Sequence, residues 1–342
     1  MNAPRVSVCV PTFNYARFLP DCIESVLQQT MADWELVITD DCSLDGTDTI
    51  VERYAKADPR IRYIRNEQRL GMSANLRRAC DLGRGEYLKV LCSDDWLAPR
   101  CLEVLSALLD QYPKAVLATP GEIYCKASGE PLGIHFLYGM PVSVIPGEEM
   151  LDRMSRGNGF GGNSSYLIRA SAYHRVGGYD PNVLYAVDYE LAARLCRTGD
   201  YVHTDEPLFY GRMHPANSST VNTGKCLDTV DWFEVPEKIF LPRRFFNREW
   251  RRYQRISALL TARYLVGIPI QHVRRNHQMA RAWTKVLLAH GNFVLGVPWV
   301  LVEAPRRLYR RITGTHRSRL VPAEPWMGPP TRRTNVMSES HV

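Results

Sequence analysis

The sequence has no Cys-x-x-Cys pair, although nine cysteines are scattered through its 342 residues. Their number is odd, and several occupy apolar positions, as Cys22 does beside Phe18, Ile23 and Val26. A thiol in such a position acts as a small hydrophobic side chain. The cysteine usage therefore argues against a disulfide framework, and we expect the protein to reside in a reducing compartment.

The chain also lacks a long hydrophobic run. Its longest apolar stretch, Phe293–Val302, is about half as long as a bilayer-spanning helix, and Pro298 interrupts it. The first residues, Met1 to Arg5, lead directly into a strand-like segment, which leaves no room for a signal peptide. These absences predict a cytoplasmic protein that neither spans a membrane nor is exported.

The composition is that of a soluble globular protein, with 45% hydrophobic, 23% charged and 10% aromatic residues. The length predicts one large domain or two ordinary ones. The net charge of +7 is unevenly distributed: residues 236–342 carry 20 basic and 5 acidic side chains, a net +15, whereas residues 1–235 carry 23 and 31, a net −8. Such a basic segment favours an anionic partner: membrane phospholipid, nucleic acid or an acidic polymer.

Short apolar segments of β type alternate with helical patterns over the first 120 residues. The expected strands are Val6–Pro11, Trp34–Thr39, Ile61–Arg65, Tyr87–Cys92 and Ala115–Thr119. The expected helices lie between them, at 17–30, 47–57, 73–82 and 99–111. This alternation predicts an α/β fold with a doubly wound, mainly parallel sheet flanked by helices.

Beyond residue 120 the pattern loosens, and many prolines and glycines up to residue 147 predict a long irregular connection. Later elements that could extend the sheet are a helix at 148–156, a strand at Ser165–Ile168, a helix at 188–198 and strands at Tyr201–His203 and Leu208–Arg212. We therefore divide the chain into a catalytic domain at 1–235, a basic helical extension at 236–312 and a tail at 313–342 that is expected to be disordered.

Polar segments follow three expected strands: Pro11-Thr12-Phe13-Asn14, Asp40-Asp41-Cys42-Ser43 and Ser93-Asp94-Asp95. Ligands bind at the carboxyl ends of strands in an open parallel sheet, so these segments are expected to line one crevice. Such residues also cap helices, and Asp95 could cap the helix entered at Pro99. Two carboxylate pairs in one crevice would repel each other, and Mg²⁺ or Mn²⁺ would relieve that repulsion. P-loop and dinucleotide-binding glycine motifs are missing, so a phosphate-bearing ligand would be held through the metal.

Four motifs occur in order within residues 5–220: Val-x-Val-Pro-Thr-Phe-Asn at 8–14, Asp-Asp-x-Ser-x-Asp-Gly-Thr at 40–47, Gly-Glu-Tyr-x-x-x-x-x-Ser-Asp-Asp at 85–95 and Asp-Tyr-Glu-Leu at 188–191. Together they resemble the family 2 glycosyltransferases of the GT-A fold. The resemblance implies inverting transfer of a sugar from a nucleotide diphosphate donor. It assigns Pro11, Thr12, Phe13, Asn14 and Asp41 to the nucleotide, with Asp41 bonded to the nucleobase. It assigns Ser93, Asp94 and Asp95 to the diphosphate and metal, with Asp95 as the favoured direct metal ligand.

Inverting transfer needs a base for the acceptor hydroxyl, and Asp188 and Glu190 are the candidates. Two residues apart on a helix, they do not share a face. Asp188 heads a stripe of apolar residues that must point inward, whereas Glu190 precedes Arg194 by four residues, as in a solvated ion pair. Asp188 is therefore the predicted base. The family usually has an acid just before this position, where this chain has Val187, so the pKa of Asp188 should be raised less.

On the donor side, the segment Tyr210-Gly211-Arg212-Met213-His214 resembles a family segment that contains Arg and His. By that likeness His214 is a candidate metal ligand or diphosphate contact, and Arg212 would offset phosphate charge. A histidine in a loop can equally be only solvated or hydrogen-bonded. Asn75 lies where many members contact the donor, although Asn75-Leu76-Arg77 departs from the family's Ala-Arg-Asn.

On the acceptor side, Gly162 and Asn163 lie in a Gly-Gly-Asn-Ser-Ser segment that resembles a loop approached closely by a sugar, with a plain turn as the alternative. Trp96 is expected to stack on the acceptor sugar. Its alternative position is in the core beneath Pro99.

In the basic extension, Arg248, Arg251, Arg252 and Arg255 fall on one helical face, and Phe293–Val302 is followed by Arg306, Arg307, Arg310 and Arg311. An apolar patch beside clustered arginines is typical of an interfacial membrane contact. The alternative is a helical subdomain that packs its apolar face on the catalytic domain and leaves the arginines in water. Nucleic acid is not expected as a partner, because no binding module accompanies the charge.

The sequence thus predicts a metal-dependent inverting glycosyltransferase on the cytoplasmic side of the membrane. Its donor would be a nucleotide diphosphate sugar, with UDP as the favoured nucleotide, and its acceptor a hydroxyl of a glycan or a lipid-linked sugar in surface polysaccharide biosynthesis. The alternatives are a metal-dependent nucleotidyltransferase and a catalytically inactive scaffold protein.

Overall fold

The computed structural model describes residues 3–135, 138–156, 161–217, 227–240, 248–273 and 277–290. A ten-stranded sheet with the order β3-β2-β1-β4-β9-β6-β10-β5 forms the centre, with β7 paired to β6 and β8 paired to β10. The strands are β1 Val6–Thr12, β2 Trp34–Asp40, β3 Ile61–Arg65, β4 Tyr87–Val90, β5 Trp96–Leu97, β6 Ala115–Lys126, β7 Pro131–His135, β8 Val142–Ile145, β9 Leu167–Arg169 and β10 Asp200–Met213.

The first half of the sheet is parallel because its strands are apolar on both faces. Residues of β2 and β4 are buried throughout, which is the pattern of strands covered by helices on both sides. The register pairs β1 with β2 from Val6 opposite Trp34 to Thr12 opposite Asp40. These two strands therefore end at the same edge of the sheet, where the polar segments begin. The second half is mixed, since β9 runs antiparallel to both β4 and β6.

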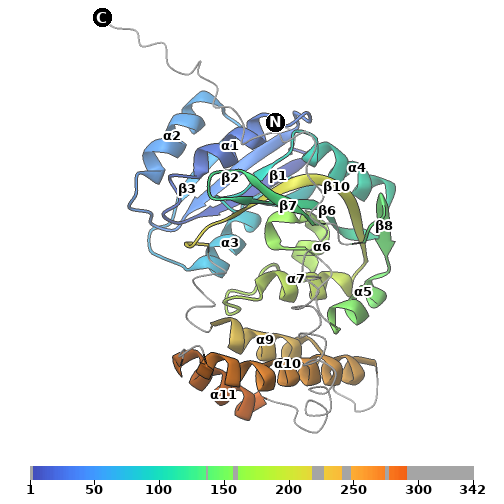
Figure 1. Ribbon diagram of the computed structural model, residues 1–342. Helices are drawn as coiled ribbons and strands as arrows, with labels where there is room; N and C mark the ends of the chain where they lie inside the picture. The colour runs from blue at the N-terminus through green and yellow to red at the C-terminus, as the bar shows by residue number, and fades with distance from the viewer. Residues whose placement is uncertain are drawn as a thin grey trace, which may run out of the picture.

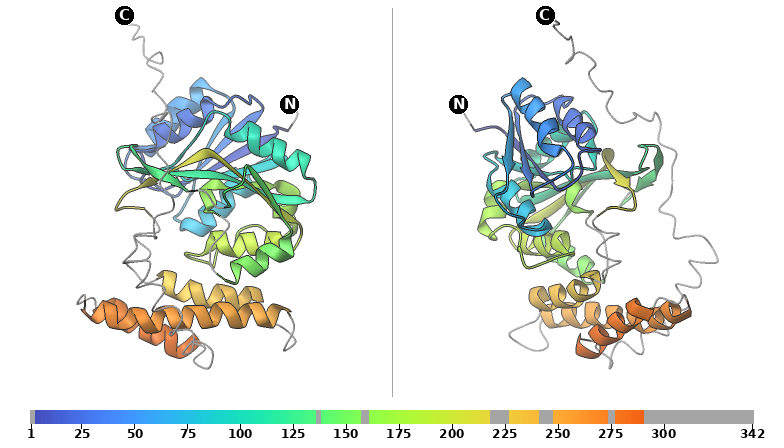
Figure 2. Two further views of the ribbon diagram at one scale, coloured as in Figure 1. Left: turned by 45° about the vertical axis from the view of Figure 1, so that its right-hand side comes forward. Right: turned by 90° about the vertical axis from the view of Figure 1, so that its left-hand side faces the viewer.

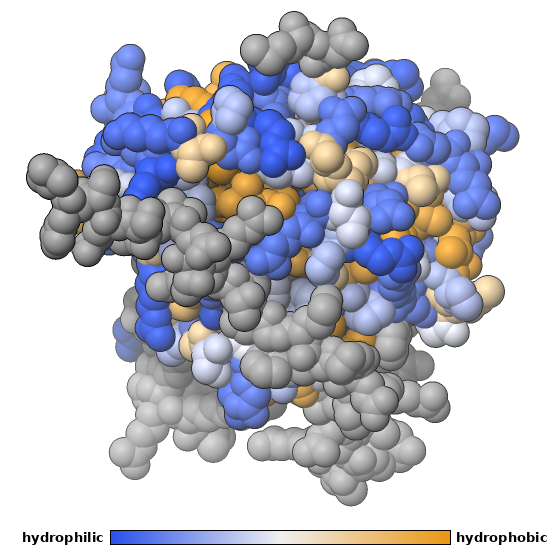
Figure 3. Space-filling view, turned by 90° about the horizontal axis from the view of Figure 1, so that it is seen from above, coloured by the Kyte–Doolittle hydropathy of each residue, from blue (hydrophilic) through white to orange (hydrophobic). Residues whose placement is uncertain are grey.

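Two helix layers cover the sheet (Figures 1 and 2). One face is covered by α1 Leu19–Leu27, α2 Thr47–Ala57 and α4 Cys101–Gln111. The other is covered by α3 Met72–Asp81, α5 Gly147–Met154, α6 Ala170–Arg175 and α7 Val187–Cys196, with a short 3₁₀ turn at Asn163–Ser165. Figure 3 looks onto the outer side of the first layer, where hydrophilic side chains predominate.

The predicted strands and helices of the first 120 residues are confirmed, as is the α/β fold class. The irregular connection expected over 120–147 is wrong, because β6 continues to Lys126 and is followed by β7 and β8. The proline and glycine at 120–121 belong to an irregular stretch of the β6–β10 pairing: a Cβ on Gly121 would lie 2.6 Å from the Asp205 carbonyl oxygen. The two strands expected at 201–212 are one strand, β10.

The extension forms a third helical layer beneath α5 and α7 (Figures 1 and 2). It consists of α9 Leu227–Phe240, α10 Arg248–Val273 and α11 His277–His290. Several of its buried apolar side chains share one hydrophobic core with α7, among them Val235, Phe240, Ile256, Leu260 and Leu287. The structure therefore favours the packed subdomain. Helix α9 also runs through residue 235, so the expected domain boundary falls inside a helix and not in a linker.

The arginines expected on one exposed face of this extension are only partly exposed. Arg252 is fully buried and pairs with Glu148, Asp152 and Glu249, and Arg248 pairs with the first two of these acids. Part of the positive charge is thus neutralised by the catalytic domain. The apolar patch at 293–302, its following arginines and the tail at 313–342 lie outside the described residues. None of the helices in the described ranges combines the length and hydropathy needed to cross a membrane.

Candidate active site

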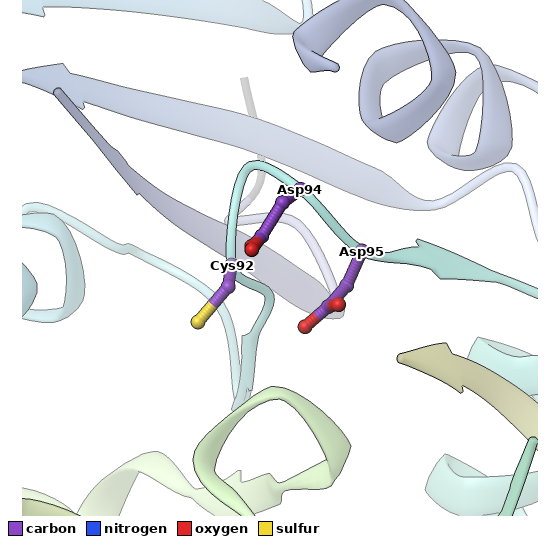
Figure 4. Close-up of side chains that lie close together, drawn as sticks. All are labelled: Cys92, Asp94 and Asp95. Atoms are coloured by element: carbon purple, nitrogen blue, oxygen red, sulfur yellow. The ribbon is translucent and has the colours of Figure 1, made fainter. Parts of the chain in front are cut away.

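The acidic loop 92–95 connects β4 to β5 at the carboxyl edge of the parallel strands. Asp95 N donates to the Cys92 carbonyl at 3.1 Å, which closes a tight turn. The side chains of Cys92, Asp94 and Asp95 project to the same side (Figure 4), and their potential ligand atoms lie within 4.8 Å of one another. Ser93 is buried in the turn. The sequence correctly placed the two aspartates side by side.

The segment that ends β10 supplies the partners of both carboxylates. Arg212 N donates to Asp95 Oδ1 at 2.9 Å, and Asn217 Nδ2 donates to Asp94 Oδ2 at 2.9 Å. His214 Nε2 lies 3.1 Å from the same Asp94 oxygen. Burial, and then the charge of Asp94, raises the pKa of Asp95 well above its usual value. A divalent cation between the two carboxylates would offset this repulsion.

The donor set of the loop suits a hard cation. Carboxylate oxygens are the ligands that Mg²⁺ and Mn²⁺ prefer, whereas the thiol of Cys92 is softer. The hydrogen bonds with Arg212, Asn217 and His214 occupy only part of the acceptor sites on the Asp94 and Asp95 carboxylates, so further lone pairs are available to a metal ion. Asp94 and Asp95 are therefore able to hold Mg²⁺ or Mn²⁺. The ligand role of His214 stays a prediction, because its ring already contacts Asp94.

Arg212 is bound by the protein itself, and its expected role of offsetting phosphate charge stays a prediction. Its guanidinium donates to the Asp94 carbonyl at 2.9 Å, the Ala127 carbonyl at 2.8 Å and Asp21 Oδ2 at 2.7 Å. The side chain is only 3% exposed, so these contacts hold the acidic loop in place from behind. Asp95 does not cap the following helix, which was the alternative to a ligand role. Its carboxylate accepts the Arg212 N–H, and that helix begins only at Cys101.

On the nucleotide side, the segments after β1 and β2 are tied together. Asn14 adopts a positive φ of 56°, and its Oδ1 accepts a hydrogen bond from Leu44 N at 2.9 Å. Pro11 and Phe13 are partly exposed, whereas Thr12 is buried. Pro11, Phe13 and Asn14 thus remain accessible to a ligand, and their contact with a nucleotide stays a prediction.

The two aspartates at the end of β2, Asp40 and Asp41, need no cation. Asp40 is fully buried and accepts hydrogen bonds from Tyr63 Oη at 2.7 Å and Arg65 Nη1 at 3.0 Å, so the protein itself neutralises its charge. Asp41 accepts the backbone N–H groups of residues 70–71 at 2.7 and 2.8 Å. The prediction that repulsion between Asp40 and Asp41 requires a metal ion is therefore wrong. The contact of Asp41 with the nucleobase of the donor stays a prediction.

Asn75 is not a donor contact. Its side chain is 2% exposed. Its Nδ2 donates to the Thr39 carbonyl at 2.9 Å, and its Oδ1 accepts Asn66 Nδ2 at 2.9 Å. These bonds tie helix α3 to the end of β2, so the amide acts on the site only through the strands that it holds.

Asp188, the predicted base, lies in the first turn of α7. Tyr166 Oη donates to its carbonyl at 3.4 Å, and the Tyr166 carbonyl accepts Val90 N at 3.1 Å, where β4 ends before the acidic loop. Burial raises the pKa of Asp188 to about 6, against the opposing hydrogen bond from Tyr189 N. A carboxylate with such a pKa is suited to accept a proton near neutral pH.

Glu122 on β6 is a site residue that the sequence reasoning missed. Its charge adds a minor contribution to the raised pKa of Asp188, which is caused mainly by burial. It is 2% exposed and accepts Tyr124 Oη at 2.8 Å and Gly162 N at 3.3 Å. These and other hydrogen bonds outweigh burial and lower the pKa of Glu122. The β-type alternation around it was the available signal, but the prolines and glycines obscured it.

Glu190, the rejected candidate base, is not solvated as expected. It is 1% exposed and accepts Arg194 Nε at 2.7 Å. Arg194 also donates to the Val176 and Gly178 carbonyls, each at 2.7 Å. The pair is therefore a buried structural link between α7 and the loop before it, which leaves Asp188 as the base candidate.

The loop with Gly162 and Asn163 lies beside Glu122, as the hydrogen bond from Gly162 N shows. Asn163 Oδ1 accepts Tyr179 Oη at 2.7 Å, which orients the amide within the loop. Both residues are partly exposed. Their position fits the acceptor-side role, which stays a prediction.

Trp96 does not stack on an acceptor sugar. Its ring is 1% exposed and lies parallel to that of Tyr210, with the ring centres 5.2 Å apart. The Arg212 guanidinium lies 4.6 Å from the centre of the indole ring. The core alternative is therefore correct: Trp96 packs behind the acidic loop because strand β5 pairs with β10.

Comparisons with known proteins agree with this fold. The chain is 29% identical over 219 residues to a chondroitin synthase of Escherichia coli, covering 64% of this chain but only 30% of the synthase. It is 35% identical over 109 residues to the putative teichuronic acid biosynthesis glycosyltransferase TuaG of Bacillus subtilis, covering 32% of this chain and 43% of TuaG.

Among solved structures, residues 1–349 of S. aureus TarS in complex with UDP superpose with a TM-score of 0.57 at 17% identity, covering 76% of this chain and 72% of that one. A mannosyltransferase from Pyrobaculum calidifontis in complex with GDP-Man and Mn²⁺ gives 0.56 at 17% identity, covering 93% and 85%. These likenesses show the GT-A fold.

The sequence profile described as "Glycosyl transferase family 2" matches residues 7–177. That match includes the acidic loop, both strand-end segments and Glu122, and it ends shortly before Asp188. The chain belongs to glycosyltransferase family 2.

Proposed function

We propose that the protein is an inverting glycosyltransferase that moves a sugar from a nucleotide diphosphate donor, with UDP as the favoured nucleotide, to a hydroxyl of a glycan or lipid-linked acceptor. The observation that carries the proposal is that a possible cation site and a carboxyl of raised pKa are linked through one residue, Tyr166. The acidic loop can hold a divalent cation, and Asp188, linked to β4 through Tyr166, has a pKa of about 6.

In this proposal Asp188 accepts the proton of the acceptor hydroxyl. The acceptor oxygen then forms a bond to the anomeric carbon while the bond from that carbon to the diphosphate oxygen breaks, and the configuration inverts. A divalent cation held by Asp94 and Asp95 would act as a Lewis acid that neutralises the departing diphosphate. Burial, with a smaller contribution from the negative charge of Glu122, keeps the pKa of Asp188 raised, and Arg212 holds the loop from behind.

The donor and acceptor classes are supported by the relatives. TarS has been solved with UDP and with UDP-GlcNAc, and the Pyrobaculum enzyme with GDP-Man and Mn²⁺. The chondroitin synthase and TuaG support a place in polysaccharide biosynthesis. The chain spans less than half the length of either, so its donor, acceptor and metal dependence are our proposals.

The donor proposal predicts metal-dependent thermal stabilisation. Melting temperature would be measured with UDP-, dTDP- and GDP-sugars, each with Mn²⁺, Mg²⁺ or EDTA. At a hundredfold excess over Kd a donor adds ~2.7 kcal/mol, which raises the melting temperature by several degrees. We expect this shift for one nucleotide class, only with metal, and strongly reduced in Asp95→Asn. A panel without any shift, or an equal shift in EDTA, would contradict the proposal.

We also propose a cytoplasmic location at the face of the membrane, with the basic chain beyond α11 as the contact. Phosphatidylcholine vesicles with and without phosphatidylglycerol would be sedimented with the protein at low and high salt. We expect binding only to the anionic vesicles and its loss at high salt, because exposed charges are screened. Indifference to the anionic lipid at low salt would remove this proposal.

A further inference from the structure

One carboxylate of the helical extension reaches the loop that precedes the candidate base. Oδ2 of Asp231, on α9, accepts Leu184 N at 2.9 Å and Ala186 N at 3.0 Å, and also contacts Tyr185 N. Asp231 is 6% exposed. A buried carboxylate that accepts three consecutive backbone N–H groups fixes the conformation of that loop strongly, because each bond is charge-assisted.

The residues held in this way lead directly into the turn that carries Asp188. Ala186 is the N-cap of α7, and its carbonyl accepts Glu190 N at 3.0 Å, so it begins the helix. A helix N-terminus has N–H groups that need partners and favours a nearby negative charge. Asp231 accepts one such group, the N–H of the N-cap Ala186, from another helix 45 residues further along the chain, and it brings a negative charge to this helix end.

The loop before α7 is held from two sides, but the contacts differ. Helix α3 binds its carbonyls, through Ser73 Oγ to Val183 and Arg77 Nη1 to Tyr179. Helix α9 binds its N–H groups through Asp231. Among these contacts, Asp231 alone reaches residues 184–186, two positions from Asp188. Lys238, also on α9, instead pairs with Asp180 at the far end of the loop and lies 4.0 Å from Glu190 in the first turn of α7.

We propose that Asp231 is a positioning residue for Asp188, so that the extension forms part of the catalytic apparatus. The inference rests on the proposed role of Asp188 as the base. Without the carboxylate of Asp231, the first turn of α7 would relax, and Asp188 would lose its alignment with the acceptor hydroxyl. The donor site, built from β1, β2 and the acidic loop, would be unaffected.

The test compares Asp231→Ala and Asp231→Asn with Lys238→Ala, a matched control that removes an ion pair of the same helix without touching residues 184–186. Transfer kinetics and donor binding would be measured at equal folded fraction. We expect kcat to fall by about 10- to 100-fold in Asp231→Ala, since a misplacement near 1 Å can cost ~10²-fold. Asp231→Asn, which keeps an acceptor oxygen, should fall by less. KM and Kd for the donor should change by less than about twofold, as expected for an effect on alignment alone.

Three results would overturn the inference: an unchanged kcat in Asp231→Asn and Asp231→Ala, an equal fall in Lys238→Ala, or a change confined to the donor KM. Comparison of Asp188→Asn with Asp231→Ala separates this inference from the proposed function. If Asp188→Asn alone keeps full turnover, the base assignment has failed. If Asp188→Asn is inactive while Asp231→Ala is fully active, only the positioning role has failed.

Discussion

Asp188→Asn is expected to lower kcat by about 10²- to 10⁴-fold, the range that a positioned general base supplies. Asparagine has the same shape but cannot accept the acceptor proton. Release of the nucleoside diphosphate at saturating donor and acceptor would measure the loss, and donor affinity should be unchanged. Full turnover in a folded variant would disprove glycosyl transfer by this base and would favour a nucleotidyltransferase, in which a metal-bridging acid replaces an isolated base.

The pH dependence of the wild type follows from the same residue. The base must be ionised, and burial raises the pKa of Asp188 to about 6. We therefore expect kcat/KM to decrease as the pH falls through about 6. A profile that stays flat down to pH 5 would contradict a base with this pKa.

The stability of Asp188→Asn should change in the opposite direction to its activity. A carboxyl whose pKa is raised in the folded state destabilises the fold once it is ionised, so wild-type stability decreases as the pH rises from about 4 to about 6. The variant lacks this charge and should be more stable than the wild type above pH 6. The advantage should disappear below pH 4, where both states of the wild type are protonated. Chemical denaturation at several pH values would measure it.

Arg252→Met is expected to destabilise the protein by about 3 kcal/mol, because it removes one partner from a buried ionic cluster. Arg252 is fully buried, and its guanidinium lies 2.9 Å from Glu148, 2.8 Å from Asp152 and 2.5 Å from Glu249. Methionine fills a similar volume but removes one cation from each of these carboxylates, so Glu148 and Asp152 keep only Arg248 and Glu249 keeps Arg197. We place the loss at the lower end of the range for buried pairs because the carboxylates are partly exposed and regain water.

Arg251→Met is the matched control for this prediction. Arg251 is the neighbouring residue on the same helix and is exposed. Substitutions of exposed residues usually change stability by less than about 0.5 kcal/mol. Equal unfolding free energies for the two variants in urea would show that the cluster does not anchor the extension.

Much of the fold followed from local patterns. Apolar runs such as Val6–Pro11 and Trp34–Thr39 are strands because their side chains must be covered on both faces. Helix α1 has a regular apolar stripe that contains Leu19, Cys22, Ile23 and Val26. The segment 120–147 could not be derived in this way. Strands β6 and β8 pair with β10, which comes much later in the chain at Asp200–Met213, and β7 pairs with β6. The irregular pairing near Gly121 looks like the end of a strand when the sequence is read alone.

In the candidate site, too, residues in local motifs could be predicted, whereas residues placed by long-range contacts could not. Asp94, Asp95 and Asp188 were identifiable because each belongs to a contiguous motif, and parallel topology brings strand ends together. The burial of Trp96 and Arg212 was not identifiable, because the same residue types serve equally well in a ligand pocket and behind it. Which of the two occurs depends on the pairing of β5 with β10, a contact between distant segments.

By itself the sequence determined the family, the α/β architecture, the acidic loop and the base candidate, since these depend on residues adjacent in the chain or on the period of a helix or strand. Only the tertiary structure decided which polar groups are satisfied by the protein itself and which still face a ligand. It neutralised Asp40, placed the charge of Glu122 near Asp188 and brought Asp231 to the start of α7. The physical reason is that burial, charge pairing and pKa depend on groups that meet across the fold and share no local pattern.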